Sequence, residues 1–511
     1  MSAYSRILCV VGALAVSTIL SQAAQAQGLV RDPAAEEAFQ AGTKLLEEQK
    51  WDEAITAFSK ATELDKTYGE AYLGSAEANR ELEDFVAALE DYKTALTIDP
   101  NSAKAFNGRG ICYRELQQYE LALSDFNNAA QQDRRDPEIA ANLGDMYVNH
   151  AQDPVSGLRV LDKAIELDPK NAEVFRNRGL AHAQLRHFDE AEADLAQSVK
   201  LKDDDYESYS MQANVFLFQD KPEKLPLAVE ALSQAIKHYK PEETSDPKTY
   251  VQGYLLRSDA SLKIARNPKT PAAERTKLYK SVIADTEAIL AENPDAYPMS
   301  GQAHFRKGVA LRLQNLYGEA IKAFTDAIQA IPAGETGAYA AEAYLKRGIC
   351  WHMQGENRLA RGDLEQAASL EYTDPLPHLW IGFTFAEEED FRAAIDSYGE
   401  AISKNPNFAL PYVNRGLAYV QLNEYQRAAD NFNEAIRVDP ANAEHFIKRG
   451  DAYMLLEEFE KAYNSFHLAT LNDDKNATAF HMAAESLKAL GRDSLAGQYE
   501  SRAQALKGMN N

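Results

Sequence analysis

Small residues recur along the chain at a nearly constant interval, each within a stretch whose apolar residues have helical spacing. Gly110 and Gly144 are 34 residues apart, and the same step separates Gly382 from Gly416. The column consists of Gly42, Ala76, Gly110, Gly144, Gly179 and Ala213, then Ser258 and Gly308 at wider spacing, and then Gly348, Gly382, Gly416, Gly450 and Ala484. A repeated interval of this size indicates an array of similar units rather than a single globular core.

Three further columns follow the small residue within each unit. Ala54, Phe58 and Ala61 show the pattern of an alanine, a large residue four positions on and another alanine three positions after that. Offsets of four and three place these side chains on one face of a helix. The small residues let two helices approach closely and the large residue fills the space between them. Each unit is therefore predicted to be a helix pair, and the fold to be all-α.

Dipeptides that end in proline close several units. Proline cannot continue a helix and restricts the residue before it, so the chain is predicted to turn at these points. They are Asp99-Pro100, Asp168-Pro169, Asn405-Pro406 and Asp439-Pro440.

These columns together resemble the tetratricopeptide repeat family. The string from Tyr412 to Tyr419, with Gly416 at its centre, is similar to the first helix of that family's repeat. The resemblance covers nearly the whole chain after the N-terminal segment, in about thirteen units. It implies an α-solenoid of stacked antiparallel helix pairs, a right-handed superhelix, and a concave groove lined by the first helix of each unit.

The regularity of the columns divides the chain into five parts. Within the first array, the segment around Asp153-Pro154 shifts the register of the repeat by one residue. Extra residues at 221–226 and 266–276 are interpreted as loop growth on the surface, with a bend or a lateral contact as the alternative. The five parts are a signal peptide (1–26), a first array of about five units (34–205), irregular units with insertions (206–300), a second array of about five units (301–476), and C-terminal capping helices with a tail (477–511).

The N-terminal segment has the pattern of a secretory signal. Arg6 precedes an apolar stretch from Ile7 to Leu20, and Ala24-Gln25-Ala26 offers a cleavage site. The mature chain is predicted to begin at Gln27 and to be periplasmic or secreted, with no membrane association after cleavage. An uncleaved membrane anchor is the alternative.

The charge balance excludes some classes of partner. The chain has 54 lysine and arginine residues against 78 aspartate and glutamate residues, a net charge of −24. Nucleic acid and anionic membrane surfaces would be repelled, whereas basic partners are compatible.

No motif for catalysis or for cofactor binding is found. The sequence lacks the His-Glu-x-x-His zinc motif, a phosphate-binding loop, a nucleophile elbow and a Cys-x-x-Cys pair. The histidines fall at different repeat positions, so no metal site is predicted. Cys112 and Cys350 occupy the same position in distant units and are interpreted as small buried residues. We therefore expect a protein that is not an enzyme and has no cofactor.

A basic residue directly precedes the small residue in seven units. We interpret this column as structural, with the side-chain stem on apolar surface and the head against a carboxylate, and recognition of an acidic ligand as the alternative. The column consists of Arg109, Arg178, Arg257, Lys307, Arg347, Arg415 and Arg449.

The groove positions implied by the family differ between the two arrays. In the first array they are polar, with Glu77, Arg80, Asn107 and Arg176 among them. In the second array they are apolar, and an exposed apolar surface is typical of an interaction site. One alternative is that the register is off by one, and another is that the superhelix packs these residues against itself. The predicted groove residues are Phe305, Val309, Leu345, Ile349, Leu379, Phe383, Val413, Leu417, Ile447 and Met454.

The predicted function is a non-catalytic scaffold or adaptor that binds other proteins or peptides, in the cell envelope or the extracellular space. In this hypothesis the apolar groove of the second array holds an apolar or amphipathic segment of a partner. The alternative is an accessory or regulatory subunit of an envelope assembly or polysaccharide export complex.

Overall fold

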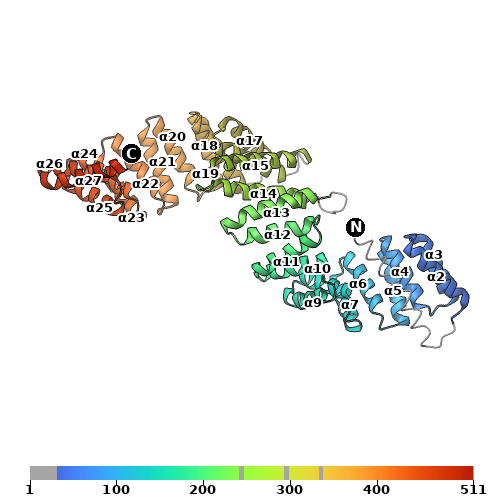
Figure 1. Ribbon diagram of the computed structural model, residues 1–511. Helices are drawn as coiled ribbons and strands as arrows, with labels where there is room; N and C mark the ends of the chain where they lie inside the picture. The colour runs from blue at the N-terminus through green and yellow to red at the C-terminus, as the bar shows by residue number, and fades with distance from the viewer. Residues whose placement is uncertain (1–30, 241–246, 293–297, 333–337, 510–511) are drawn as a thin grey trace. The chain divides into compact units, whose positions relative to one another are not determined.

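The computed structural model describes residues 31–240, 247–292, 298–332 and 338–509, and every regular element in these ranges is a helix (Figure 1). The predicted signal peptide, residues 1–26, lies outside the described residues. The all-α prediction is confirmed.

In the described ranges, twelve pairs of helices that follow one another in the chain pack together as a first and a second helix. The first helices of these pairs are α2 (Pro33–Glu47), α4 (Gly69–Glu81), α6 (Ala103–Glu115), α8 (Pro137–Asp145), α10 (Ala172–Gln184), α12 (Tyr206–Phe218), α16 (Met299–Leu313), α18 (Ala338–Met353), α20 (Leu376–Glu387), α22 (Ala409–Gln421), α24 (Ala443–Leu455) and α26 (Ala477–Ala489). The second helices are α3 (Trp51–Leu64), α5 (Phe85–Ile98), α7 (Tyr119–Gln132), α9 (Pro154–Leu167), α11 (Phe188–Leu201), α13 (Leu225–His238), α17 (Tyr317–Gln329), α19 (Asn357–Leu370), α21 (Phe391–Lys404), α23 (Tyr425–Val438), α25 (Phe459–Asn472) and α27 (Asp493–Met509). Helices α14 (Pro247–Arg266) and α15 (Ala272–Glu292) come between the sixth and the seventh of these pairs along the chain.

The chain separates into two compact bodies, Met1–Ile264 and Ala265–Asn511. The division falls in α14, inside the segment predicted to be irregular from residue 206 to residue 300. The limits of the five predicted parts stay a prediction.

The two helices of a pair approach closely because a large side chain of the second helix lies against the small residue of the first. Phe432 on α23 is 1% exposed, and a Cβ atom added to Gly416 on α22 would lie only 2.6 Å from its ring. The same relation joins Phe58 to Gly42 and Leu364 to Gly348. The predicted columns are thus the contact surface of each pair.

The turn between the two helices of a pair ends the first helix in the same way along the array. Asn423 after α22 and Glu83 after α4 have φ values of 56° and 62°, in the left-handed region. The next amide in each case donates to a carbonyl near the end of the helix, as Asp84 does to Asn79 at 2.9 Å. This C-cap satisfies helix carbonyls that lack an intrahelical donor and reverses the chain.

Within each body, first helices contact the first helices of adjacent units. Helix α4 contacts α2 and α6, α10 contacts α8 and α12, and α18 contacts α16 and α20. These contacts bring side chains of successive first helices side by side within one body. The concave groove that the family resemblance implies along the first helices stays a prediction.

The register shift near Asp153-Pro154 has a local cause. Helix α8 ends at Asp145 and continues as a π-helical turn from Met146 to His150. A π turn accommodates one extra residue without ending the helix, so the following pair keeps its packing.

The insertions of the irregular segment combine loops and helical residues. The second insertion places a surface loop at residues 267–271 between α14 of 20 residues and α15 of 21, and the first forms a 3₁₀ turn, Pro222–Lys224, before α13. The interpretation as loop growth on the surface therefore fits residues 267–271, whereas residues 272–276 belong to α15.

Both cysteines predicted to be buried are free thiols in the core. Burial raises the pKa of Cys112 to about 11 and that of Cys350 to about 12. Thiols of this kind are poor nucleophiles at neutral pH.

None of the helices in the described ranges combines the length and apolarity needed to cross a bilayer.

Removing one of the large side chains should open a cavity in a pair and destabilise the second array. We expect Phe432→Ala to lower the free energy of unfolding by about 3–5 kcal/mol, measured by urea denaturation followed by circular dichroism. Leu359→Ala, at a side chain 50% exposed on α19, is the control and should change it by less than about 0.5 kcal/mol. Equal effects of the two changes would contradict the assignment.

Candidate functional site

The structure buries most of the apolar groove predicted in the second array. Six of the ten residues are at most 7% exposed, because their side chains turn into the seam between neighbouring units. Leu345 and Ile349, for example, share one core cluster with Ile381 on α20, the first helix of the next unit. The six residues, at which the prediction of an open apolar groove is wrong, are Val309, Leu345, Ile349, Leu379, Val413 and Ile447.

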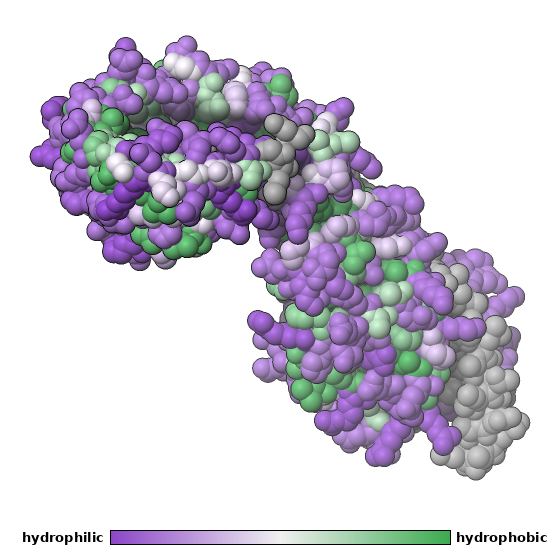
Figure 2. All heavy atoms as spheres, turned by 60° about the vertical axis from the view of Figure 1, so that its left-hand side comes forward, coloured by the Kyte–Doolittle hydropathy of each residue, from purple (hydrophilic) through white to green (hydrophobic). Residues whose placement is uncertain are grey.

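The other four predicted groove residues are partly accessible. Phe305 and Phe383 pack against aromatic rings of their own body, and Met454 accepts a hydrogen bond from the Ser486 hydroxyl at 3.3 Å. Leu417 is 39% exposed. Figure 2 likewise shows hydrophobic side chains scattered among hydrophilic ones on the face in view. Four such residues do not amount to a continuous apolar groove.

The basic column is structural, as predicted. Arg109, Arg178 and Arg347 each pair with an aspartate sixteen residues later, at 2.6–2.7 Å. Lys307 pairs with a glutamate of the preceding helix at 2.9 Å. The remaining three donate to uncharged acceptors, as Arg415 does to Asn431 at 2.7 Å. These pairs fasten the first helix of a unit to a second helix.

The first array carries a continuous row of polar side chains on its first helices, which we call the polar face. Its residues come from α4, α6, α8 with its π turn, α10 and the start of α12. They are Glu77, Arg80, Lys104, Asn107, Arg114, Glu138, Asn142, Asp145, Asn149, Glu173, Arg176, Asn177, Asp205 and Glu207.

Amide side chains join α6 to α8. Asn107 is 8% exposed and donates to the carboxylate of Glu138 at 3.2 Å. Its own amide oxygen accepts from Asn142 at 3.1 Å. Since a buried amide must satisfy both its donor and its acceptor, these contacts hold Asn107 in one orientation and link the two helices.

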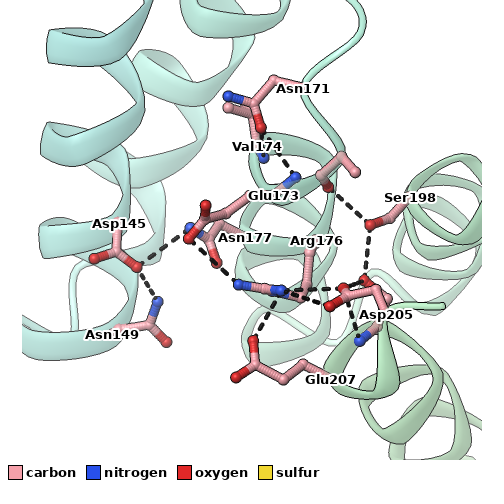
Figure 3. A network of polar contacts seen from close by, with 12 residues as sticks. Asp145, Asn149, Asn171, Glu173, Val174, Arg176, Asn177, Ser198, Asp205 and Glu207 are labelled. Carbon is pink, nitrogen blue, oxygen red and sulfur yellow. Dashed lines mark hydrogen bonds and ion pairs between the residues drawn. The ribbon is translucent and has the colours of Figure 1, made fainter. Parts of the chain in front are cut away.

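Asp145 is the centre of the next part of the polar face (Figure 3). Its carboxylate accepts from Asn149 at 2.7 Å and from the buried Asn177 of α10 at 3.2 Å. Arg114 of α6 approaches the same carboxylate at 3.4 Å. One carboxylate thus ties three successive first helices together.

Arg176 closes the row at the junction of α10 and α12. Its guanidinium lies 3.0 Å from Asp205 and 2.8 Å from Glu207, and it also contacts Glu173 at 3.3 Å. Its side chain is 13% exposed and that of Asp205 is 7% exposed. Figure 3 shows the guanidinium lying between these carboxylates. Charge-assisted hydrogen bonds of this kind are stronger than neutral ones.

The carboxylate of Asp205 is stabilised in its charged form. Burial by itself would raise its pKa, but Arg176, the hydroxyl of Ser208 and Lys202 outweigh burial and lower the pKa of Asp205 below its ordinary value. Asp205 also caps α12 by accepting from the backbone N–H of Ser208 at 3.3 Å. The same side chain therefore starts a helix and holds Arg176.

At the other end of the polar face, on α4, the pKa of a carboxyl group is raised instead of lowered. Desolvation raises the pKa of Glu77, although Arg80 and Lys104 act against it, and Glu138 and Glu81 add repulsion. A carboxylate in this environment favours a positively charged or hydrogen-bond-donating ligand.

The polar face offers donors and acceptors along one line, and it contains six carboxylates against four cations. This arrangement suits the main-chain amides and the basic side chains of a polypeptide. The sequence pattern identified most of these positions as polar but attached no role to them. Asn142, Asn177, Asp205 and Glu207 are not among the groove positions that the family resemblance implies, and the sequence analysis missed them.

Models of tetratricopeptide repeats match several parts of the chain. One described as tetratricopeptide repeat matches residues 39–103, 150–207 and 284–335, and a second of the same description matches residues 91–124. A model described as TPR repeat matches residues 416–457.

Comparison with individual proteins finds more distant similarity. The chain is 23% identical over 245 residues to Hsp70-Hsp90 organizing protein 1 of Glycine max. The aligned region covers 48% of this chain and 38% of that relative. Among solved structures, YrrB, titled a TPR protein with an unusual peptide-binding site, is 24% identical, with 38% of this chain and 96% of that chain covered and a TM-score of 0.33. Yeast Tom70 is 15% identical, with 91% and 96% covered and a TM-score of 0.36.

Loss of the Arg176 charge should leave the carboxylate of Asp205 without its main partner. We expect Arg176→Gln to destabilise the first body by about 2–3 kcal/mol at neutral pH, measured by urea denaturation. Because Asp205 has a lowered pKa in the folded state, its contribution is present above the ordinary aspartate pKa of about 3.9 and is lost as the pH falls through the folded-state value. The difference from wild type should therefore shrink below about pH 4.

The matched control is Lys163→Gln, which removes an exposed ion pair with Glu166 in the same body. It should change the free energy of unfolding by less than about 0.5 kcal/mol at any pH. A difference for Arg176→Gln that stays constant on acidification would show that the interaction does not depend on an ionised Asp205.

Proposed function

Because the chain is a tetratricopeptide-repeat protein, we propose that it is a non-catalytic scaffold that binds an extended, basic segment of a partner polypeptide on the polar face of its first array. Proteins of this family bind other proteins or peptides, and the Glycine max relative is named as an organizing protein for Hsp70 and Hsp90. The observation that carries the proposal is the continuous row of amides and charges across five first helices.

The length of the partner segment follows from the spacing of the helices. Adjacent packed helices lie roughly 10 Å apart, so five first helices span roughly 40 Å. An extended polypeptide rises about 3.3 Å per residue, and a segment of about twelve residues therefore covers the polar face.

The charge of the segment follows from the excess of carboxylates. Glu138 and Glu173 of the polar face are exposed, and the net charge of the whole chain is −24. Basic side chains are attracted by both the local and the overall field. Since the polar side chains already hold one another in place, the ordering cost on binding is reduced.

The place where this scaffold acts is proposed to be the cell envelope or the extracellular space. The proposal is supported by Arg6, the apolar stretch from Ile7 to Leu20, and the cleavage pattern at Ala24-Gln25-Ala26. A role as accessory subunit of an envelope assembly or polysaccharide export complex is the alternative, in which the bound segment belongs to a fixed component of that complex.

Removing charge from the polar face should weaken binding of basic segments. Peptides are selected from a displayed random library on the wild-type protein, and their Kd is measured by fluorescence anisotropy. We expect the selected peptides to be rich in lysine and arginine, the double change Glu138→Gln and Glu173→Gln to raise Kd at least tenfold, and high salt to raise it further.

The matched control is the double change Glu90→Gln and Glu120→Gln, which removes two exposed carboxylates from the second helices α5 and α7. It alters the net charge equally and should leave Kd within a factor of two or so, because screening limits distant surface charges. Equal weakening by both pairs would mean that only the overall charge attracts the peptide, and selection of apolar or acidic peptides would overturn the proposal.

The export hypothesis has its own test. The full chain is expressed in a bacterium and the mature protein is recovered from the periplasm or the medium. Mass spectrometry of the N-terminus is expected to find Gln27 as the first residue, and Ala26→Asp should block cleavage because the site requires a small residue there. An uncleaved protein in the cytosol would contradict the hypothesis.

A further inference from the structure

We propose that His481, Glu485 and Glu500 form a binding site for a divalent transition-metal ion, with Zn²⁺ as the ion best suited to it. The three residues belong to α26 and α27, the last described helix pair. This site lies in the second body, and it is independent of the polar face.

The geometry brings one ligand atom of each residue into a single small region. His481 and Glu485 are one helical turn apart on α26, which places them on the same face. Glu500 comes from α27, and its carboxylate lies 2.9 Å from Nδ1 of His481. One ligand atom from each of the three residues lies within 4.8 Å of the other two. Among the described residues, this is the one group of three or more potential ligands that meets this distance.

The repeat pattern provides an independent observation. Glu500 stands sixteen residues after Ala484, at the position where other units have a large apolar residue such as Phe432 or Phe466. Those side chains fill the space between the two helices of a pair. A carboxylate at this position cannot do so by apolar packing, and here it faces a histidine of the first helix instead. A metal ion between the two helices would replace the missing apolar contact by a cross-link.

The ligand set agrees with the chemistry of Zn²⁺. Zinc accepts imidazole nitrogen and carboxylate oxygen, and sites with three protein ligands leave a position for water or another ligand. The side chains of His481 and Glu500 are 39% and 26% exposed, so an ion has access from solvent. The sequence prediction of no metal site relied on recurring histidines, and a site with one histidine and two glutamates escapes that criterion.

Lys488 competes for one of the ligands. Its ammonium lies 2.6 Å from a carboxylate oxygen of Glu485. The positive charge of the ammonium opposes that of an ion bound to the same carboxylate, even when the ion takes the other oxygen, so Lys488 weakens the binding of a metal ion. The structure therefore makes an unusual prediction, namely that removing Lys488 tightens metal binding while removing a ligand weakens it.

The experiment uses the full chain, freed of metal with EDTA and dialysed, and titrated with ZnCl₂ by isothermal calorimetry. We expect one Zn²⁺ per chain, Kd raised at least tenfold by His481→Ala and by the isosteric Glu500→Gln, and Kd lowered severalfold by Lys488→Ala. Zinc should also raise the thermal unfolding midpoint of the wild-type protein, and this shift should vanish in Glu500→Gln. Circular dichroism of the metal-free variants verifies that they fold.

His378→Ala, which removes a histidine of α20 outside the cluster, is the matched control and should bind Zn²⁺ as the wild type does. Two results would overturn the proposal. One is the absence of stoichiometric binding at millimolar ZnCl₂, which would leave His481 and Glu500 as an ion pair alone. The other is unchanged binding in both His481→Ala and Glu500→Gln, which would place the ion elsewhere.

Discussion

The contact between a small residue on the first helix and a large side chain on the second is the interaction on which each unit depends. In the pair formed by α24 and α25, the ring of Phe466 lies so close to Gly450 that no side chain fits at that position. The hydrophobic cluster that contains Phe466 also includes Ala479 of the next unit. A helix pair therefore buries only part of its apolar surface, and the next pair completes the burial. This is the reason why the fold exists as an array and not as separate pairs.

The close approach of the helices leaves little room for polar groups, and the chain places them in two ways. Residues of the basic column, such as Arg109 and Arg178, bind aspartates of the second helix and so connect the two helices of the pair. Side chains of the polar face bind one another between units, as Asp145 does with Asn177. Unpaired ions in such positions would be strongly destabilising, so the contacts of the polar face contribute to stability as well as to recognition.

This double use of polar groups explains the difference between the two arrays. In the second array, apolar residues such as Ile349 and Val413 occupy the inter-unit seam, and their burial supplies the adhesion between units. In the first array, hydrogen-bonded networks supply part of that adhesion and remain partly open to solvent. A ligand that offers amides and basic groups can join such a network without displacing a packed core. The last helix pair differs again, since Glu500 replaces the large apolar residue with a group that can bind an ion.

The sequence by itself determined the helix pairs and the contact columns, because the repeat places the same small and large residues at the same helical positions in many units. It also identified the role of the basic column, since a long cationic side chain beside a close helix contact lays its stem on apolar surface and directs its charged head to a nearby acceptor. It did not decide which groove positions are open. Whether a residue such as Ile349 faces the groove or the seam depends on the rotation of one helix against the next unit, and a small rotation exchanges the two.

The contacts of the polar face, like the burial of the groove positions, were decided only by the tertiary structure. Asn177 joins Asp145 across 32 residues of sequence, and His481 meets Glu500 across 19. No local pattern relates such pairs, because their distance is set by the packing of whole helices. The periodic part of the sequence was readable since each unit repeats the same physical requirement, whereas the sites arise where single side chains from different helices converge.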